Sequence, residues 1–355
     1  MEAFEKNIRK VEPYVPGEQP RQRVVKLNTN ENPYPPAPGV ERALRELDTA
    51  DFRLYPDPAC SVLVDAIADH YKVGRDQVFV GVGSDDVLSL CFLTFFNSDK
   101  PILFPDITYS FYKVWARLYR IPYECKKVDE DFRIVREDYY GENGGVIFPN
   151  PNAPTALYES LELVEDILRH NRDVIVIVDE AYIDYAGPSA IELIDRYDNL
   201  VVTQTFSKSR SMAGMRIGYA IASPKLIRYL NDVKYSFNSY TLNRASLVCG
   251  AEAVKDRAYF EETVEKIKAT RERAGERLAR LGFSFPESSA NFLFATHPDY
   301  DAREIFEALK EKGIYVRWWD SARIRQYVRI TVGTDEEMEK LFAALEAFMA
   351  GRKAV

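Results

Sequence analysis

The stretch LVVTQTFSKS, residues 200–209, joins an apolar run to a lysine between two serines, and it indicates the fold more than any other part of the chain. Leu200 to Thr203 is apolar on both faces, as in a buried strand of a parallel sheet. Lys208 follows the end of that strand, and Arg216, eight residues further on, can supply a planar cation for a phosphate. We interpret this combination as a lysine that forms a Schiff base with a phosphorylated aldehyde cofactor. The alternative is a solvated surface lysine.

The overall composition is that of an ordinary soluble globular protein. The chain has 355 residues, of which 46% are hydrophobic and 29% charged, and its formal charge is −8. It contains no basic block and no run of 18 apolar residues, so we expect neither a nucleic-acid nor a membrane partner. With only three His and four scattered Cys, we expect no metal site and a reducing, cytoplasmic location. The four cysteines are Cys60, Cys91, Cys125 and Cys249.

The order of segments predicts an α/β protein with two domains and an N-terminal arm. Residues 1–38 are rich in Pro and Asn and are expected to form an extended arm and part of the small domain. In residues 39–255, short apolar strands alternate with helical segments, which predicts a large domain with a mostly parallel sheet covered by helices. Its expected strands include residues 78–80, 102–104, 146–148, 174–178, 200–203 and 218–222.

Residues 256–355 are expected to form a smaller α+β domain. A charged helix from Asp256 to Leu281 ends before Gly282, a plausible C-cap, and links the two domains. Strands are expected at Asn291–Ala295, Tyr315–Trp318 and Tyr327–Val332. Helices that start at residues 301 and 334, each with a Glu three positions later, alternate with these strands.

Polar side chains follow several of the predicted strands. Asp179 ends one of them, where open α/β sheets bind ligands, and its carboxylate suits a protonated pyridine nitrogen. Tyr182 can donate to a ring oxygen. Alternatively, Asp179 caps the next helix and Tyr182 only packs. Tyr109 follows another strand and is suited to stack on an aromatic ring, or simply to pack.

Two loops add possible ligand contacts. In Gly81 to Asp86 (GVGSDD), the glycines allow a tight turn, and the helix that follows presents free N–H groups to an anion. The segment lacks the Walker A and GxGxxG patterns, so no dinucleotide is implied. Asn150 to Thr155 (NPNAPT) follows a strand and offers Asn side chains to a polar ligand, or forms only a rigid loop.

Together these segments resemble the fold-type I pyridoxal-phosphate (PLP) enzymes of the aspartate aminotransferase superfamily, and most closely the histidinol-phosphate aminotransferases. The resemblance covers nearly the whole chain. The lysine and Asp-Glu-Ala-Tyr segments are widespread in the superfamily, whereas Tyr-Val-Pro-Gly and Asn-Glu-Asn-Pro narrow the choice. The matching segments are residues 13–18, 27–33, 54–57, 83–85, 179–182, 205–218, 290–292 and 328–334.

The resemblance implies a role for each candidate residue. Lys208 would carry PLP and move the proton at the substrate, while Asp179 would keep the ring nitrogen protonated. The phosphate of PLP would be held by Ser84, Asp85, Ser207 and Arg216, with Tyr55 reaching it from the neighbouring subunit of a homodimer with shared active sites. Tyr109 would stack on the ring, and Tyr182 and Asn152 would bond its oxygen. Substrate contacts would come from Tyr14, Asn30, Asn291, Arg317 and Arg329.

The resemblance implies transfer of an amino group between histidinol phosphate with 2-oxoglutarate and imidazole-acetol phosphate with glutamate. Arg329 and Arg317 would bind the substrate phosphate, although Arg317 is equally a surface strand residue. The alternatives are an aromatic amino-acid aminotransferase, a threonine-phosphate decarboxylase and a non-catalytic regulator. The sequence departs from the usual Asn-Pro-Thr-Gly turn at Ala153 and Ala156, which suggests a slightly different turn. Asn152, or else Asn150, would replace the missing Asn.

Overall fold

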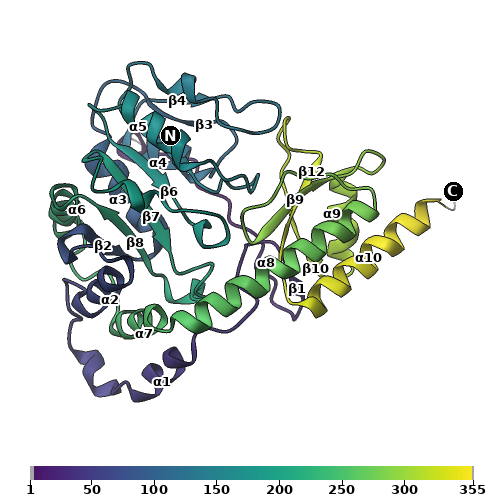
Figure 1. The fold of residues 1–355 in the computed structure, drawn as a ribbon, viewed down its shortest axis with the longest axis horizontal. Helices are drawn as coiled ribbons and strands as arrows, with labels where there is room; N and C mark the ends of the chain where they lie inside the picture. Colours follow the sequence, from purple (N-terminus) through teal and green to yellow (C-terminus); the bar gives the residue numbers. More distant parts are fainter. Residues whose placement is uncertain (1–3, 354–355) are drawn as a thin grey trace.

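A seven-stranded, mostly parallel sheet forms the centre of the larger part of the molecule (Figure 1). The computed structural model describes residues 4–353. The strand order is β2-β8-β7-β6-β5-β3-β4, and only β8 runs antiparallel to its neighbours. The predicted α/β class is therefore confirmed. The strands are β2 (Val78–Gly81), β3 (Ile102–Pro105), β4 (Tyr123–Lys126), β5 (Val146–Pro149), β6 (Val176–Asp179), β7 (Leu200–Thr205) and β8 (Gly218–Ala222).

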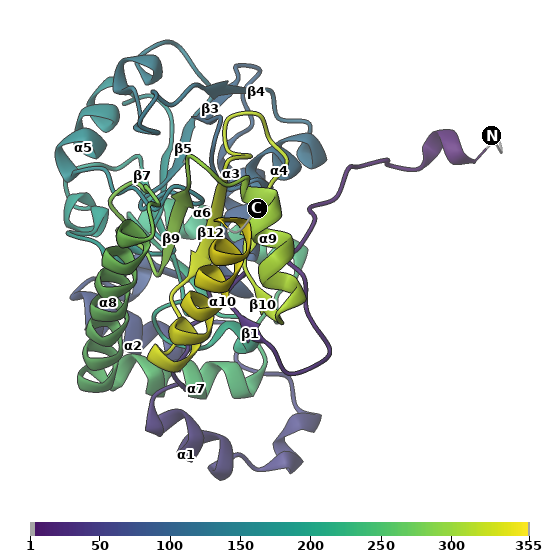
Figure 2. The ribbon, with the colours of Figure 1, turned by 90° about the vertical axis from the view of Figure 1, so that its right-hand side faces the viewer.

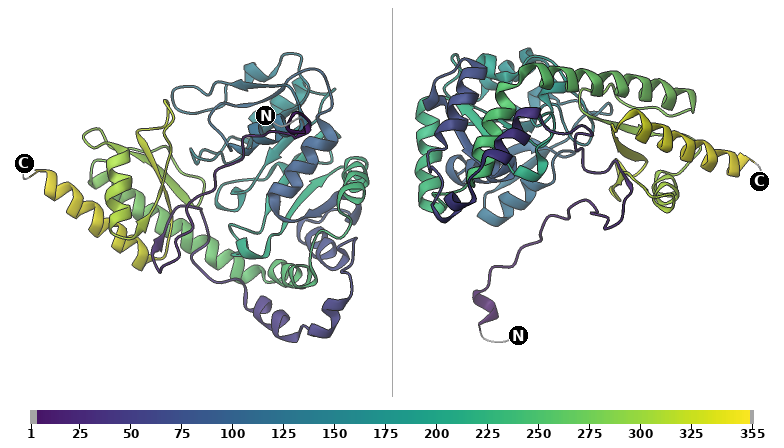
Figure 3. Two further views of the ribbon diagram at one scale, coloured as in Figure 1. Left: turned by 180° about the vertical axis from the view of Figure 1, so that it is seen from behind. Right: turned by 90° about the horizontal axis from the view of Figure 1, so that it is seen from below.

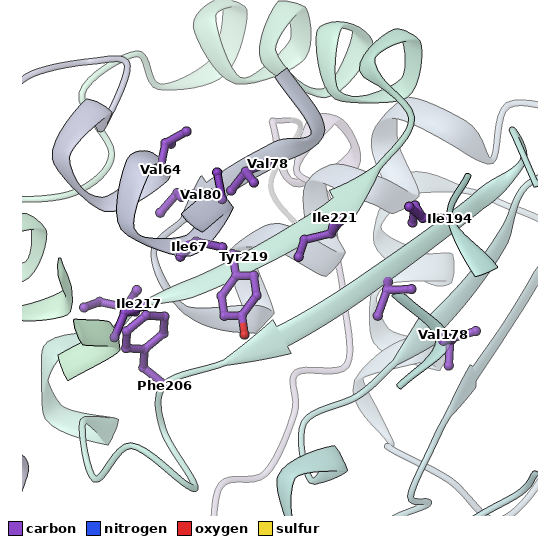
Figure 4. Close-up of a cluster of buried hydrophobic side chains, with 14 of the residues drawn as sticks. Val64, Ile67, Val78, Val80, Val178, Ile194, Phe206, Ile217, Tyr219 and Ile221 are labelled. Carbon is purple, nitrogen blue, oxygen red and sulfur yellow. The ribbon is translucent and has the colours of Figure 1, made fainter. Parts of the chain in front are cut away.

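Helices cover both faces of this sheet because the central strands are apolar on both faces. Successive residues of β6 alternate between two cores: Val176 and Val178 belong to one and Ile177 to the other. Figure 4 shows part of the first core, in which Phe206 packs beside Ile217 and Tyr219 just before the Lys208 segment. Helices α1 (Pro38–Glu46), α2 (Ser61–Tyr71), α5 (Leu161–His170) and α7 (Arg244–Lys255) cover the first core, whereas α3 (Gly83–Phe95), α4 (Phe111–Tyr119) and α6 (Pro224–Phe237) cover the second.

The smaller part packs three helices against a separate sheet of order β11-β12-β9. Helix α8 (Arg257–Arg280) runs from the large part to this sheet (Figures 1 and 3). The domain boundary expected after residue 255 stays a prediction, and in the structure α7 ends at that residue. The remaining elements are β9 (Phe292–Thr296), α9 (Ala302–Glu311), β11 (Arg317–Trp318), β12 (Tyr327–Thr331) and α10 (Asp335–Lys353).

The expected strand at Tyr315–Trp318 is wrong as a single strand. It divides at Val316 because its two halves pair in different sheets: β10 (Ile314–Tyr315) pairs with β1 (Val25–Lys26) of the arm, while β11 pairs with β12. The arm therefore contributes a short strand to the smaller part. Residues 9–24, before β1, contain no helix or strand, and Figure 2 shows the described part of the arm leading away from the body of the molecule.

Two expected helix starts and one helix end match their local chemistry. Thr334 and Glu337 form both hydrogen bonds of a capping box at α10, and Asp301 accepts two backbone N–H bonds at α9. Gly282 follows α8 with a φ of +91°, which favours glycine. Among residues 4–353, no helix is both long and apolar enough to cross a membrane.

Candidate active site

A cavity of about 370 Å³ opens where the arm, the large sheet and the small sheet meet. It lies at the carboxyl ends of the parallel strands, where such sheets bind ligands. Eight of the sequence-predicted residues or departures line it: Tyr14, Asn30, Tyr109, Ala153, Tyr182, Lys208, Arg317 and Arg329. The other lining side chains include Asn28, Asp106, Lys113, Trp319, Ser321 and Ile324.

Lys208 lines this cavity and has a weakened preference for its charged form. Its segment is anchored by buried Phe206, whose backbone pairs with Ile217 and Met212. The Nζ atom donates to the backbone oxygen of Thr29 at 2.9 Å. Burial, and then the charge of Arg329, lower the pKa of Lys208 to about 8. The solvated-surface alternative is therefore not what the structure has.

Asp179 is buried without an ionic partner. Tyr112 of α4 donates to its Oδ2 atom at 2.8 Å, and Thr203 of β7 lies 3.4 Å from Oδ1. Among residues 4–353, no cation lies within ion-pair distance of this carboxylate. Burial raises the pKa of Asp179 to about 6. The alternative role as a helix cap is not realised, since the next helical turn (Ile183–Tyr185) begins after Tyr182.

The glycine-rich turn brings the start of α3 against the lysine loop. A Cβ atom on Gly218 would lie 2.3 Å from the backbone of Gly83 and Ser84, so only glycine permits this approach. Gly83 itself has a φ of +81°, and a Cβ there would meet the Arg216 guanidinium at 2.5 Å. The first N–H groups of α3 and the Arg216 side chain therefore lie together.

Two side chains fix Asp85 at this helix start. Arg216 forms an ion pair with Oδ2 at 3.0 Å, and the Tyr109 hydroxyl donates to Oδ1 at 2.8 Å. Ser207, beside Lys208, accepts from Thr205 at 3.0 Å. The predicted phosphate residues thus form one cluster next to the cavity.

Both candidate Asn side chains of the NPNAPT loop are engaged in bonds within the protein. The side-chain N–H groups of Asn152 bond Ile107 and Thr155, which leaves a buried Oδ1 without a partner. Asn150 exchanges two hydrogen bonds with Glu159. Ala156 adopts a φ of +65°, the conformation that glycine favours, so alanine is held in the left-handed region at this turn.

Tyr182 is held by residues of the arm and small sheet. The side chain of Asn30 donates to its hydroxyl at 2.9 Å, so the hydroxyl proton points elsewhere. Asn30 is fixed in turn by Thr331, which donates to its Oδ1 atom, and by Asn291, which donates to its backbone oxygen at 3.0 Å. Asn291 therefore lies behind Asn30 rather than in the cavity. Tyr14 stacks on Phe111 with ring centroids 4.2 Å apart.

The part of the cavity wall formed by β11 and β12 carries two arginines, paired across the two strands, without a carboxylate partner among the described ion pairs. Arg329 lies between the rings of Phe292 and Trp319, 5.1 Å from each, and donates to the backbone oxygen of Asn28 at 2.9 Å. Its Nε atom is buried without a partner. Arg317 lies 5.3 Å from Trp319 and donates to backbone oxygens of the arm at residues 15 and 16. This wall is suited to an anion.

Tyr55 lies away from the cavity, whereas Tyr112 and Trp319, which the sequence did not indicate, lie at the site. Tyr55 is 78% exposed, stacks on Tyr240 at 4.5 Å and lies outside the cavity. The sequence interpretation missed Tyr112, although it lies three residues after Tyr109 at the start of a helix. It also missed Trp319, which no pattern around Arg317 indicates. Within residues 4–353, no cluster of three His, Cys, Asp or Glu side chains could hold a metal ion.

The strand order, the lysine after β7 and the carboxylate after β6 define a fold-type I aminotransferase. The family model "Aminotransferase class I and II" matches residues 22–345. The histidinol-phosphate aminotransferase of Chromohalobacter salexigens is 50% identical over 340 residues, covering 96% of this chain and 97% of that protein. That of Clostridium beijerinckii is 48% identical over 98% of this chain and 97% of that protein.

A solved structure of similar fold is the histidinol-phosphate aminotransferase of Sinorhizobium meliloti in complex with pyridoxal-5'-phosphate. It has a TM-score of 0.82 and 26% identity, and the match covers 90% of this chain and 89% of that one. The chain therefore belongs to the class I and II aminotransferases and, within them, to the histidinol-phosphate aminotransferase family.

Proposed function

We propose that this chain is a PLP-dependent aminotransferase that interconverts histidinol phosphate plus 2-oxoglutarate and imidazole-acetol phosphate plus glutamate in histidine biosynthesis. The observation that carries the proposal is one cavity lined both by Lys208 and by Arg317 and Arg329, two arginines without a carboxylate partner among the described ion pairs. Relatives about 50% identical over nearly the whole chain bear this function in their names.

The residues present fit PLP at each of its polar groups. Asp179 is a buried carboxylate without a cation, which suits a protonated ring nitrogen. The N–H groups at the start of α3, at Ser84 and Asp85, suit the phosphate together with Ser207 and Arg216. Tyr109 offers its ring for stacking, and Lys208 offers its amine. When bound, PLP supplies an electron sink for the charge that develops at the α-carbon of the substrate.

We propose that Lys208 accepts and returns the proton at the α-carbon of the substrate. Its pKa of about 8 leaves a large neutral fraction at pH 8, and a neutral amine is what a general base requires. Asp179 would hold the proton on the ring nitrogen, because a buried carboxylate is stabilised by an adjacent cation. Tyr182 would donate to the ring oxygen in the orientation that Asn30 fixes. Since both N–H groups of Asn152 are engaged, its proposed part is to support the turn.

Arg329 and Arg317 would bind the substrate phosphate, and Tyr14 and Asn30 would border the imidazole. Arg329 is already oriented by stacking and by Asn28, whereas Arg317 would exchange its long contacts to the arm, at 3.3 and 3.4 Å, for the phosphate. A second guanidinium favours a dianionic phosphate over the single carboxylate of an aromatic amino acid. Asn291 would contribute indirectly, by positioning Asn30.

The substrate is tested by measuring kcat/KM side by side with histidinol phosphate, phenylalanine and threonine phosphate. We expect the highest value with histidinol phosphate, with imidazole-acetol phosphate as the product. A preference for phenylalanine would support an aromatic aminotransferase instead. Loss of CO₂ from threonine phosphate would support a decarboxylase.

We also propose that the protein is a homodimer in which Tyr55 reaches the cofactor phosphate of the second subunit. We propose the cytoplasm as its location. The support for the dimer is that Tyr55 is exposed and stacks on exposed Tyr240, with exposed Phe52 and Leu54 in the same segment. The support for the location is the free cysteines, which are typical of a reducing compartment. Sedimentation of the active enzyme tests this proposal: a fully active monomer would exclude a role for Tyr55.

A further inference from the structure

Tyr112 contacts the candidate cofactor site from within the core. Its side chain is fully buried in the first turn of α4, among the rings of Phe92, Phe104 and Trp115. Its hydroxyl donates to Oδ2 of Asp179 at 2.8 Å. Neither Tyr112 nor Asp179 is among the residues that line the cavity, so Tyr112 acts on a ligand indirectly, through its hydrogen bond to Asp179.

The hydrogen bond opposes the effect of burial on Asp179. Burial raises the pKa of the carboxyl, whereas the Tyr112 hydroxyl, ahead of the longer Thr203 contact, lowers it. Burial and the adjacent carboxylate raise the pKa of Tyr112 well above its usual value, so the phenol stays protonated and remains a donor. Without this donor, a carboxylate in an apolar core is less stable in its charged form.

The same turn of chain fixes a second carboxylate. Tyr109 lies three residues before Tyr112, and the two rings meet edge to face with centroids 5.8 Å apart and an interplanar angle of 89°. The Tyr109 hydroxyl donates to Asp85 at the phosphate end, and the Tyr112 hydroxyl donates to Asp179 at the other end. The start of α4 therefore sets the positions of both carboxylates relative to each other.

We propose that Tyr112 is a positioning residue for Asp179: its hydroxyl donates to Oδ2 and stabilises the anionic carboxylate, so that Oδ1, whose bond from Thr203 is long, can accept from the protonated ring nitrogen of the cofactor. The inference rests on the PLP part of the proposed function and not on the identity of the substrate. A chain that prefers phenylalanine would leave it intact.

The experiment is equilibrium binding of PLP to the cofactor-free full-length protein, measured from pH 5 to pH 9 for Tyr112→Phe and the unsubstituted protein. We expect the dissociation constant at pH 8 to rise by at most about 150-fold, the upper value for one hydrogen bond to a charged group, because the bond is already present in the cofactor-free protein and only its strengthening on binding is lost. The acid limb of the binding curve should also move to higher pH, because Asp179 then protonates more readily. Unchanged affinity together with an unchanged acid limb would overturn the proposal.

Two further variants separate positioning from a general effect on folding. Tyr185→Phe is a matched control, since Tyr185 is also a buried tyrosine but its hydroxyl has no partner. We expect its affinity and acid limb to match the unsubstituted protein. In the Asp179→Asn background, Tyr112→Phe should change affinity less than twofold, because the carboxylate it positions is absent. A loss as large as in the native background would refute positioning through Asp179, and this result does not depend on whether Tyr112→Phe alone is slightly destabilised.

Discussion

Replacing Arg329 tests both the anion-binding end of the cavity and the effect of this charge on the pKa of Lys208. Arg329 carries its charge without a carboxylate partner and lies between two aromatic rings, with a buried Nε atom that has no acceptor. A hydrogen bond to a charged group contributes about 1.5–3 kcal/mol. Arg329→Gln should therefore lower kcat/KM for histidinol phosphate by roughly 10- to 150-fold.

The loss should depend on the substrate phosphate. L-histidinol lacks that group, so its already low kcat/KM should change only slightly in Arg329→Gln. Arg329→Lys keeps the charge without the planar fork, so its kcat/KM for histidinol phosphate should lie between those of the unsubstituted protein and Arg329→Gln. Arg325→Gln is the control, because Arg325 is an exposed residue close by that pairs with Asp320 and lies outside the cavity.

A second observable comes from the coupling to Lys208. The charge of Arg329 is one of the causes that lower the pKa of Lys208 to about 8, so its removal should raise that pKa. The pH at which cofactor-free protein captures PLP half-maximally should then move upward in Arg329→Gln. Equal losses for histidinol and histidinol phosphate, with no movement of the capture profile, would refute the reasoning.

Two further predictions concern the stability of the cofactor-free protein and the link between the two parts of the molecule. In cofactor-free protein, the pKa of Asp179 is raised from about 3.9 in the unfolded chain to about 6 in the folded one, so the contribution it makes to stability is present below pH 4 and is lost as the pH rises through 6. Asp179→Asn should remove this loss and stabilise the cofactor-free protein at pH 8 by as much as about 3 kcal/mol, measured by urea unfolding. The same substitution should weaken PLP binding. A variant less stable than the unsubstituted protein at pH 8 would contradict the argument that burial destabilises the charged carboxylate. Arg323, after β11, bonds Asp106 at 3.2 Å and the backbone oxygens of residues 128 and 129, which ties the small part to the large one beside the cavity. Arg323→Gln should raise KM several-fold with little change in kcat. An unchanged KM would show that this link between the two parts does not contribute to substrate binding.

The sequence predicted the elements whose chemistry is local. Lys208 and Asp179 could be placed because Asp179 ends a buried strand and Lys208 lies three residues after another, and parallel strands end at one edge of a sheet. The contacts of Tyr112 and Trp319 could not be predicted, since they depend on how α4 and β11 pack against distant segments. The split at Val316 was missed for the same reason: one half of the expected strand pairs with an arm nearly 300 residues away in the chain. The occupation of Asn152 by Ile107 and Thr155 likewise appears only when two loops are folded together.

The central claim is that Lys208 is the lysine that holds the cofactor, and chemical fixation tests it most directly. Borohydride reduction of the PLP-loaded protein, followed by peptide mass analysis, locates the amine to which the cofactor is bound. Lys113 also lines the cavity and Lys26 lies close to it, paired with Glu31, so both are internal rivals. The account predicts the reduced cofactor on the peptide that contains Lys208 and on no other. Label on Lys113 or Lys26, with Lys208 unmodified, would contradict it.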